Sequence, residues 1–210
     1  MNAETNGIDP KLTESSELIG HFNKIKLLES IANQIGFYGV QCGNATLMDY
    51  IDMNCGGIPE GEFAQVVDVS APMQFLSMYT KTAENRFAFA VTELLKMNAG
   101  FLEALANSCF QAGKDMQIPS VADARQAFEI YNDFVLDGMI DEQTKEIVAQ
   151  SASKIVWKKL SDTHEAAWKK AGGDLNVYYL LQKSFVSGLF AESRYAYNIE
   201  DNTTFSLFRL

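Results

Sequence analysis

The sequence predicts an all-α protein, an elongated bundle of about four helices that includes two long amphipathic helices. Apolar residues recur at three- and four-residue spacing from Ser70 to Ala112, and again from Ser120 to Ala171. This is the period of a helix that buries one face. Gly113 and Pro119 separate the two stretches, and such residues end helices. We therefore take residues 15–171 as a helical bundle.

The first helix is expected to begin near Ser15 or Ser16, where Ile19, Phe22 and Ile25 start an apolar stripe. Further along, Ala32, Gly36, Gly39 and Gly43 follow at spacings of four, three and four. Small residues on one side of a helix allow a second backbone to come close. Interior glycines also cost about 1 kcal/mol each relative to alanine, so the same residues are equally typical of a helix that ends or kinks. Both interpretations stay open.

The stretch from Ser70 to Ala112 carries two apolar surfaces. Residues seven apart form a seam suited to helix–helix packing: Phe87, Leu94 and Phe101. A second apolar contact face consists of Phe75, Phe89, Leu95, Leu102 and Phe110. Glu84, Arg86 and Glu93 are interpreted as positions on the remaining polar face. Before this helix, residues 54–69 are expected to be an extended connector, since the apolar run Val66–Val69 has no evident strand partner.

The stretch from Ser120 to Ala171 begins at a capping-box variant formed by Ser120 and Asp123. At Asp137–Gly138 the helix either continues or breaks and restarts. The apolar pattern then runs through Ile155, Trp157 and Trp168 to Gly172–Gly173.

Residues 172–210 are expected to form an aromatic-rich C-terminal helix, from Leu175 to about Tyr195, followed by a tail. The tail is conspicuously apolar: Phe205, Leu207, Phe208 and Leu210. An exposed apolar terminus normally needs a cover. The tail therefore packs back on the bundle, docks on a partner or stays loose, and residues 1–14 are expected to be a flexible leader because they are polar.

Composition and charge exclude several classes of function. The net charge of −10 repels phosphate backbones and anionic lipids, so nucleic acids and acidic membranes are not expected as partners. No run is long and apolar enough for a transmembrane segment, and the N-terminus lacks the pattern of a secretory signal, so the expected location is the cytoplasm. The three cysteines, Cys42, Cys55 and Cys109, have no metal-binding spacing. We expect no cofactor and no metal.

Two motifs resemble metal sites and lack an essential ligand. His164-Glu165-Ala166-Ala167-Trp168 begins like H-E-x-x-H but has tryptophan in place of the second histidine. Asp133, Asp137 and Asp141 have part of the spacing of an EF-hand loop, but Thr144 stands where the bidentate acid belongs. No nucleophile motif or phosphate-binding loop was found either, so no catalytic residue is predicted.

The segments AGFLEALANSCFQAGKDM, IPSVADARQAF and EQTKEIVAQSASKIVWKKL together resemble a phasin, a helical protein that coats polyhydroxyalkanoate storage granules. The resemblance is one of pattern and covers residues from about Ser70 to Lys170. It implies a non-enzymatic, oligomeric protein whose apolar contact face lies on a hydrophobic polymer surface while its acidic face keeps granules dispersed.

Two other hypotheses remain open. A helical adaptor or assembly subunit would bind a protein partner through the apolar tail or the glycine stripe, and deletion of residues 199–210 would abolish that binding. An enzyme on an all-α scaffold would need a polar pocket, for which the candidates are His21, His164, Tyr131 and Asp133.

Overall fold

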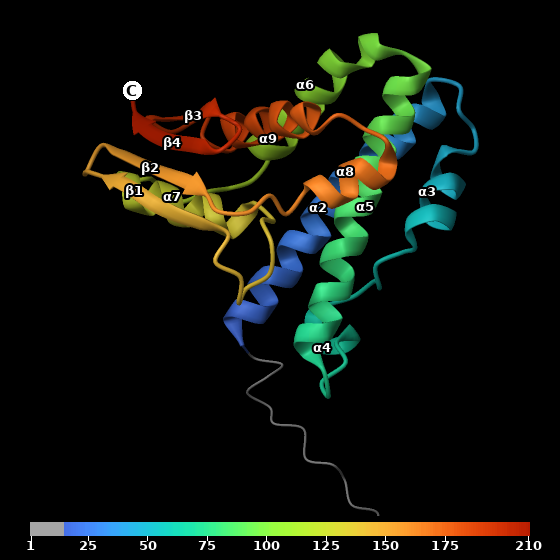
Figure 1. The fold of residues 1–210 in the computed structure, drawn as a ribbon, viewed down its shortest axis with the longest axis horizontal. Helices are drawn as coiled ribbons and strands as arrows, with labels where there is room; N and C mark the ends of the chain where they lie inside the picture. Colours follow the sequence, from blue (N-terminus) through green and yellow to red (C-terminus); the bar gives the residue numbers. More distant parts are fainter. Residues whose placement is uncertain (1–14) are drawn as a thin grey trace, which may run out of the picture.

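The computed structural model describes residues 15–210, so the predicted leader lies outside the described residues. In the described part, eight α-helices and one four-stranded antiparallel sheet pack together (Figure 1). The prediction of an all-α elongated bundle is therefore wrong. The helices are α2 (Ser16–Gln41), α3 (Leu47–Cys55), α4 (Phe63–Val66), α5 (Pro72–Met97), α6 (Leu102–Lys114), α7 (Ala124–Phe134), α8 (Glu165–Ala171) and α9 (Leu175–Leu189). The strands are β1 (Lys145–Gln150), β2 (Lys154–Lys159), β3 (Tyr195–Asp201) and β4 (Thr204–Arg209).

Helices α2 and α5 are the longest helices of the described residues, with 26 residues each, and they pack in parallel. Phe22 contacts Phe75 near the start of both helices, with ring centroids 6.0 Å apart. Near their ends, Gly39 lies beside Leu94. The chain runs back from the end of α2 to the start of α5 through α3 and α4 (Figure 1).

Gly36 and Gly39 let α3 approach α2 closely. The helix continues through both glycines and ends at Gln41. A Cβ on Gly36 would collide with Met48 and one on Gly39 with Leu47, and both of these side chains come from α3. The close-approach interpretation of the glycine stripe is therefore confirmed for these two positions.

The first predicted long helix is divided at residues 98–101. Helix α5 ends at Met97, and the short 3₁₀ turn Ala99–Phe101 leads into α6. The side-chain Oδ1 of Asn98 accepts a hydrogen bond from the backbone N of Gly100 at 2.8 Å. This local bond competes with the helical pattern, and glycine at position 100 weakens the helix further. The chain therefore turns, and α6 packs along α9.

The second predicted long helix does not exist, because residues 145–159 form a β-hairpin. Only α7 and α8 remain helical within residues 120–171. The cap lies at Asp123, whose side chain accepts from the backbone N of Gln126. Neither alternative at Asp137–Gly138 is fully correct. Helix α7 already ends at Phe134, Gly138 has φ 77° in the loop that follows, and the chain then enters β1 and does not restart as a helix.

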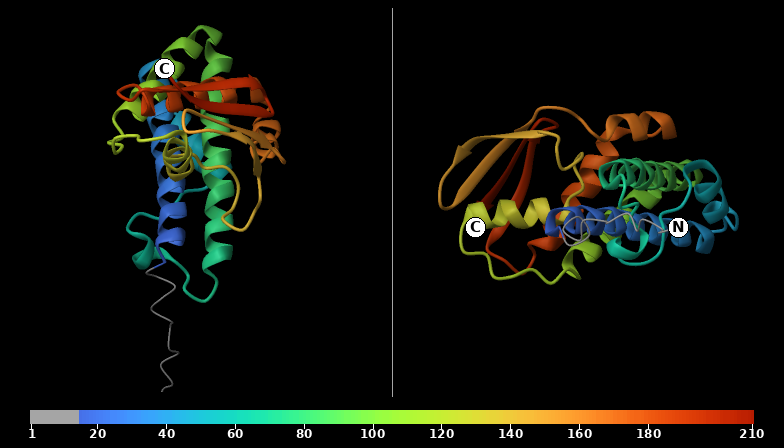
Figure 2. Two further views of the ribbon diagram at one scale, coloured as in Figure 1. Left: turned by 90° about the vertical axis from the view of Figure 1, so that its left-hand side faces the viewer. Right: turned by 90° about the horizontal axis from the view of Figure 1, so that it is seen from below.

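The sheet has the order β1-β2-β4-β3 and joins two hairpins through the β2–β4 pair. Strands alternate side chains between two faces. The buried face consists of Ile155, Trp157, Tyr195, Tyr197, Phe205 and Leu207. Helix α7 packs against β2 and β4 (Figure 2). The ring centroids of its Phe128 and Tyr131 lie 4.9 and 5.0 Å from that of Trp157.

The apolar tail is strand β4, so it packs back on the protein. Phe205 and Leu207 are buried, Phe208 is half-buried, and Leu210 is exposed. The residues predicted as one C-terminal helix divide into α9 and the strand β3. Strands β1 and β2 belong to the predicted bundle, residues 15–171, and strands β3 and β4 to the predicted C-terminal segment, residues 172–210. The two predicted segments therefore share one sheet.

No helix within residues 15–210 combines the length and the apolar composition needed to cross a bilayer.

Candidate functional site

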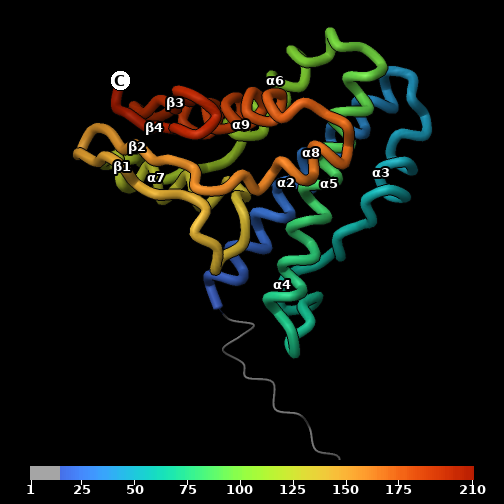
Figure 3. Tube along the Cα trace, in the orientation of Figure 1, coloured from blue at the N-terminus to red at the C-terminus, as the bar shows by residue number. Residues whose placement is uncertain are grey.

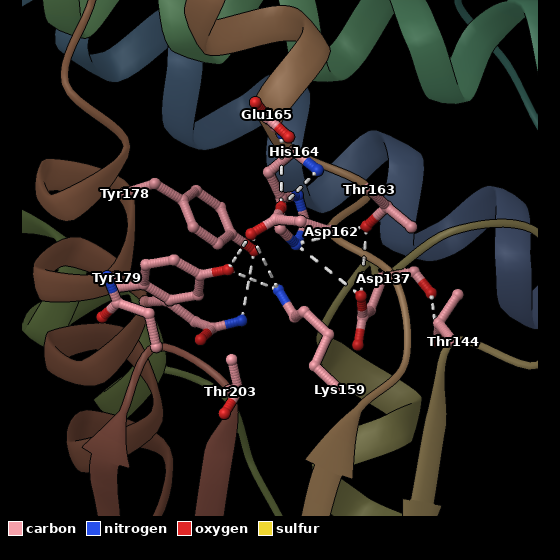
Figure 4. A network of polar contacts seen from close by, with 12 residues as sticks. Asp137, Thr144, Lys159, Asp162, Thr163, His164, Glu165, Tyr178, Tyr179 and Thr203 are labelled. Atoms are coloured by element: carbon pink, nitrogen blue, oxygen red, sulfur yellow. Dashed lines mark hydrogen bonds and ion pairs between the residues drawn. The ribbon is translucent and has the colours of Figure 1, made fainter.

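A cluster of charged and hydroxyl side chains lies inside the protein where the sheet meets the helices. Its residues come from α5, the α7–β1 loop, the end of β2, the β2–α8 loop and α9 (Figure 4). Figure 3 shows how the chain leaves β2, passes directly into α8 and lies against α5 there. Charged groups are rarely buried without partners, and most of the charged groups in this cluster are paired with one another.

His164 lies at the centre of the cluster and has no exposed surface. Its Nδ1 is 3.0 Å from Oε1 of Glu84, and its Nε2 is 3.7 Å from Oδ1 of Asp137. The ring stacks on Tyr178 with centroids 3.9 Å apart. The imidazole therefore bridges a carboxylate on α5 and a carboxylate in the α7–β1 loop.

Asp137 holds the second carboxylate of this bridge. Lys145 Nζ lies 2.9 Å from its Oδ2, and Thr163 Oγ1 donates to its Oδ1 at 3.1 Å. Burial acts to raise the pKa of Asp137, but Lys145, His164 and Lys159 outweigh it and hold that pKa below its ordinary value. Asp137 therefore stays ionised at neutral pH.

Lys159, Tyr179 and Asp162 form a second chain of contacts beside His164 (Figure 4). Lys159 Nζ donates to the Tyr179 hydroxyl at 2.6 Å, and that hydroxyl donates to Asp162. Burial lowers the pKa of Lys159, although Asp137 and Asp162 attract its charge. Burial, together with the bond to Asp162, raises the pKa of Tyr179. Asp162 also accepts from the backbone N of His164 at 3.0 Å, which fixes the loop before α8.

A cavity of about 390 Å³ lies between α5, α8 and the α7–β1 loop, directly beside the cluster. We call it the α5–α8 cavity. Its wall includes Glu84, Asn85, Thr163 and two lysines, Lys81 and Lys170. A second acid, Glu142, also lines it, and its Oε2 accepts from the backbone N of Met139 at 2.9 Å. The volume lies in the range of small-molecule sites, about 300–1,000 Å³.

Glu84 is the one residue that belongs both to the His164 bridge and to the wall of this cavity within residues 15–210. It is 6% exposed, and its Oε1 is occupied by His164. Its other oxygen, Oε2, is buried and has no hydrogen-bond partner. A buried acceptor without a donor costs about 1–3 kcal/mol, and more when it is charged.

Gly138 lets the α7–β1 loop form one wall of the cavity. Its φ of 77° lies in the left-handed region that glycine favours. A Cβ there would meet Thr144 and Thr163 at 2.6 and 3.0 Å. The loop is also held by Thr144 Oγ1, which donates to the backbone O of Asp137 at 3.2 Å.

The residues predicted as an apolar contact face are now distributed over several environments. Phe75 is buried against Phe63 and Tyr79. Phe89, Leu95 and Leu102 are half-buried, and Phe110 is 37% exposed. In the predicted helix seam, Phe87 and Leu94 are core residues and Phe101 is half-buried beside Tyr38.

The four residues considered for an enzyme do not come together at one site. His164 belongs to the cluster, whereas Tyr131 packs among aromatic rings against the sheet. His21 and Asp133 line a different cavity, of about 690 Å³, beside α2. Within residues 15–210 there is no group of three or more His, Cys, Asp or Glu side chains arranged to hold a metal ion.

No protein-family model, curated protein or solved structure matches this chain.

Sequence reasoning missed Glu84, Lys159 and Tyr179. Glu84 was interpreted as part of a polar, solvated face of the 70–112 helix, and its burial depends on α8, which lies 80 residues further along the chain. His164 was already a candidate. The sequence held one further signal for the loop that carries it, because an aspartate such as Asp162 just before a helix is typical of a residue that caps the helix.

Proposed function

We propose that the protein binds a small polar molecule in the α5–α8 cavity and that the carboxylate of Glu84 is its buried acceptor. The observation that carries the proposal is that Glu84, whose Oε2 is buried without a hydrogen-bond partner, lines a cavity of about 390 Å³. His164 holds the other oxygen at 3.0 Å, so the carboxylate is fixed in orientation before a ligand arrives. Preorganised polar groups of this kind bind with a smaller entropic cost.

The charges around the cavity favour a ligand with two different ends. A donor such as an amine fits the free oxygen of Glu84. Lys81 and Lys170 line the same cavity, and neither forms an ion pair with any residue from 15 to 210. These two exposed ammonium groups favour an acidic group at the other end of the ligand. The proposed ligand class is therefore a small molecule that carries both an amine and a carboxylate.

The test is calorimetric titration of the full chain with glycine, β-alanine, 4-aminobutyrate and 6-aminohexanoate. These four compounds carry the same two charged groups at increasing separation. We expect at least one of them to bind, and Glu84→Gln to weaken that binding by about tenfold to a hundredfold, because a hydrogen bond to a charged group contributes about 1.5–3 kcal/mol.

The matched control is Glu165→Gln, since Glu165 is an exposed acid on α8 that does not line the cavity. It should bind with the affinity of the wild type. Failure of all four compounds to bind the wild type contradicts the proposal, as does an affinity that Glu84→Gln leaves unchanged while its melting curve shows a folded protein.

The granule-coating hypothesis remains a second prediction, together with its cytoplasmic location, its oligomer and its lack of enzymatic activity. The alternative, a partner protein bound through the C-terminal tail, is also still a prediction. Sedimentation of the purified protein with polyhydroxyalkanoate granules tests the first. If the protein stays in the supernatant at every granule concentration, the hypothesis is wrong.

A further inference from the structure

A third cavity, of about 510 Å³, lies where the C-terminal ends of α6 and α9 meet the end of the β3–β4 hairpin. We call it the basic cavity. Three cationic residues line it: Lys114, Arg194 and Arg209. Apolar side chains form another part of its wall: Met116, Ile118, Val121 and Leu189. It shares no lining residue with the α5–α8 cavity.

The three cations of the basic cavity have no partners within residues 15–210. None of their side chains forms an ion pair or a hydrogen bond there. The two other arginines of the chain differ in this respect. Arg86 pairs with Asp52 at 2.7 Å, and Arg125 with Glu129 at 3.1 Å.

The fold brings these cations together by two close contacts. Helices α6 and α9 cross at Gly113 and Gly188, where any Cβ would overlap the facing backbone. Their C-terminal ends therefore lie side by side. In the sheet, the backbone N of Leu210 donates to the backbone O of Arg194 at 2.8 Å, and Arg209 pairs with Tyr195, so Arg194 and Arg209 are diagonal neighbours at this end of the β3–β4 hairpin.

The balance of charge in the basic cavity is positive although the whole chain carries −10. Three cations face one acid, Glu192. Each of the two helix C-termini contributes roughly half a negative charge. About one positive charge therefore remains, next to an apolar wall.

We propose that the basic cavity binds a phosphate monoester. Arginine guanidinium groups bind phosphate oxygens in pairs of parallel hydrogen bonds, and a dianionic group suits three converging cations. Arg194, Arg209 and Lys114 hold the phosphate group. The organic part of the ligand lies against Met116, Ile118 and Leu189.

The test is calorimetric titration of the full chain with phenyl phosphate and with inorganic phosphate at low ionic strength. Phenyl phosphate should bind, and more tightly than inorganic phosphate, because its ring buries apolar surface of the cavity wall. The double variant Arg194→Gln/Arg209→Gln should bind phenyl phosphate at least about tenfold more weakly. Both side chains are exposed, so this variant should keep the melting curve of the wild type.

Arg125→Gln is the control, because Arg125 is an exposed arginine on α7 outside the basic cavity. It should leave the affinity unchanged. Methyl NMR spectra should show shifts at Ile118, Val121 and Leu189. The proposal is overturned if phenyl phosphate does not bind, if it binds no more tightly than inorganic phosphate, if the double variant equals the wild type, or if the shifts appear elsewhere. None of these results depends on Glu84.

Discussion

Asp137 carries a negative charge at a position where burial opposes it. Its side chain is 5% exposed, and Lys145, 2.9 Å away, is 18% exposed. Removing one partner of such a pair leaves the other charge buried and uncompensated. Asp137 also accepts from Thr163 and faces His164, so the same side chain holds the loop before α8.

Asp137→Asn should therefore destabilise the protein at pH 7 by about 3 kcal/mol, the lower end for a broken buried pair. The folded-state pKa of Asp137 is lowered, so its contribution is present above the unfolded value of about 4 and is lost as the pH falls through the folded value. Urea unfolding at pH 7 and at pH 3 measures both effects. Asp49→Asn, at an exposed site in α3, serves as the control. Equal stability of Asp137→Asn and the wild type at pH 7 would show that the pair is not stabilising.

His21 is the second titratable side chain whose environment makes a pH prediction. It is 2% exposed, and its Nε2 lies 2.9 Å from the Thr80 hydroxyl. Burial, with a smaller contribution from Lys24, lowers the pKa of His21 to about 4. In the unfolded chain a histidine has a pKa of about 6.5, so the unfolded state binds the proton first.

The stability that His21 contributes is therefore fully present above pH 6.5 and is lost as the pH falls from 6.5 towards 4, by about 3 kcal/mol in all. His21→Gln should remove this part of the pH dependence. Urea unfolding at pH 7, 6 and 5 measures it. A wild-type stability that stays constant across this range would contradict the assignment.

At the scale of single elements, helix periodicity predicted some segments and misassigned others. The start of α2, near Ser15 or Ser16, was predicted from its apolar stripe, whereas its continuation through Gly36 and Gly39 was left open and is explained by the contacts of these glycines with α3. The hairpin was missed because apolar residues in KEIVAQSASKIVWKK fit both a helical stripe and an alternating strand. The choice is made by tertiary packing: Ile155 and Trp157 are buried on the face of the sheet that packs against α7, while the flanking residues Lys154 and Lys158 are exposed.

The α6–α9 crossing gives a prediction at this scale. Gly188→Ala should destabilise the protein by at least about 2 kcal/mol, since the new Cβ would overlap the backbone carbonyl of Phe110 and a backbone cannot move aside as a side chain can. Thermal and urea unfolding measure the effect.

Gly20→Ala is the matched control for this crossing. Gly20 lies inside α2 and nothing stands within 4 Å of its added Cβ. Alanine there should leave the stability unchanged or raise it by up to about 1 kcal/mol. A Gly188→Ala protein as stable as the Gly20→Ala protein would mean that the two helices do not cross at this close distance.

At the scale of the whole molecule, the site exists because distant segments converge. Three residues that are far apart in the chain meet there: Glu84 on α5, Asp137 in a loop and His164 before α8. The imidazole of His164 lies 3.0 Å from the Glu84 carboxylate and 3.7 Å from the Asp137 carboxylate. No local pattern in the sequence predicts that meeting. His164 was a candidate from its residue type alone, whereas Glu84 and Lys159 had no local signal because their burial follows from how the sheet packs on the helices.

The most direct measurement of the central claim is a crystal structure of the protein with the tightest-binding compound of the amino acid series. The account predicts that the amine lies in the α5–α8 cavity within hydrogen-bonding distance of Oε2 of Glu84, while the His164–Glu84 contact stays in place. A compound bound elsewhere, or one whose amine points away from Glu84, would contradict it.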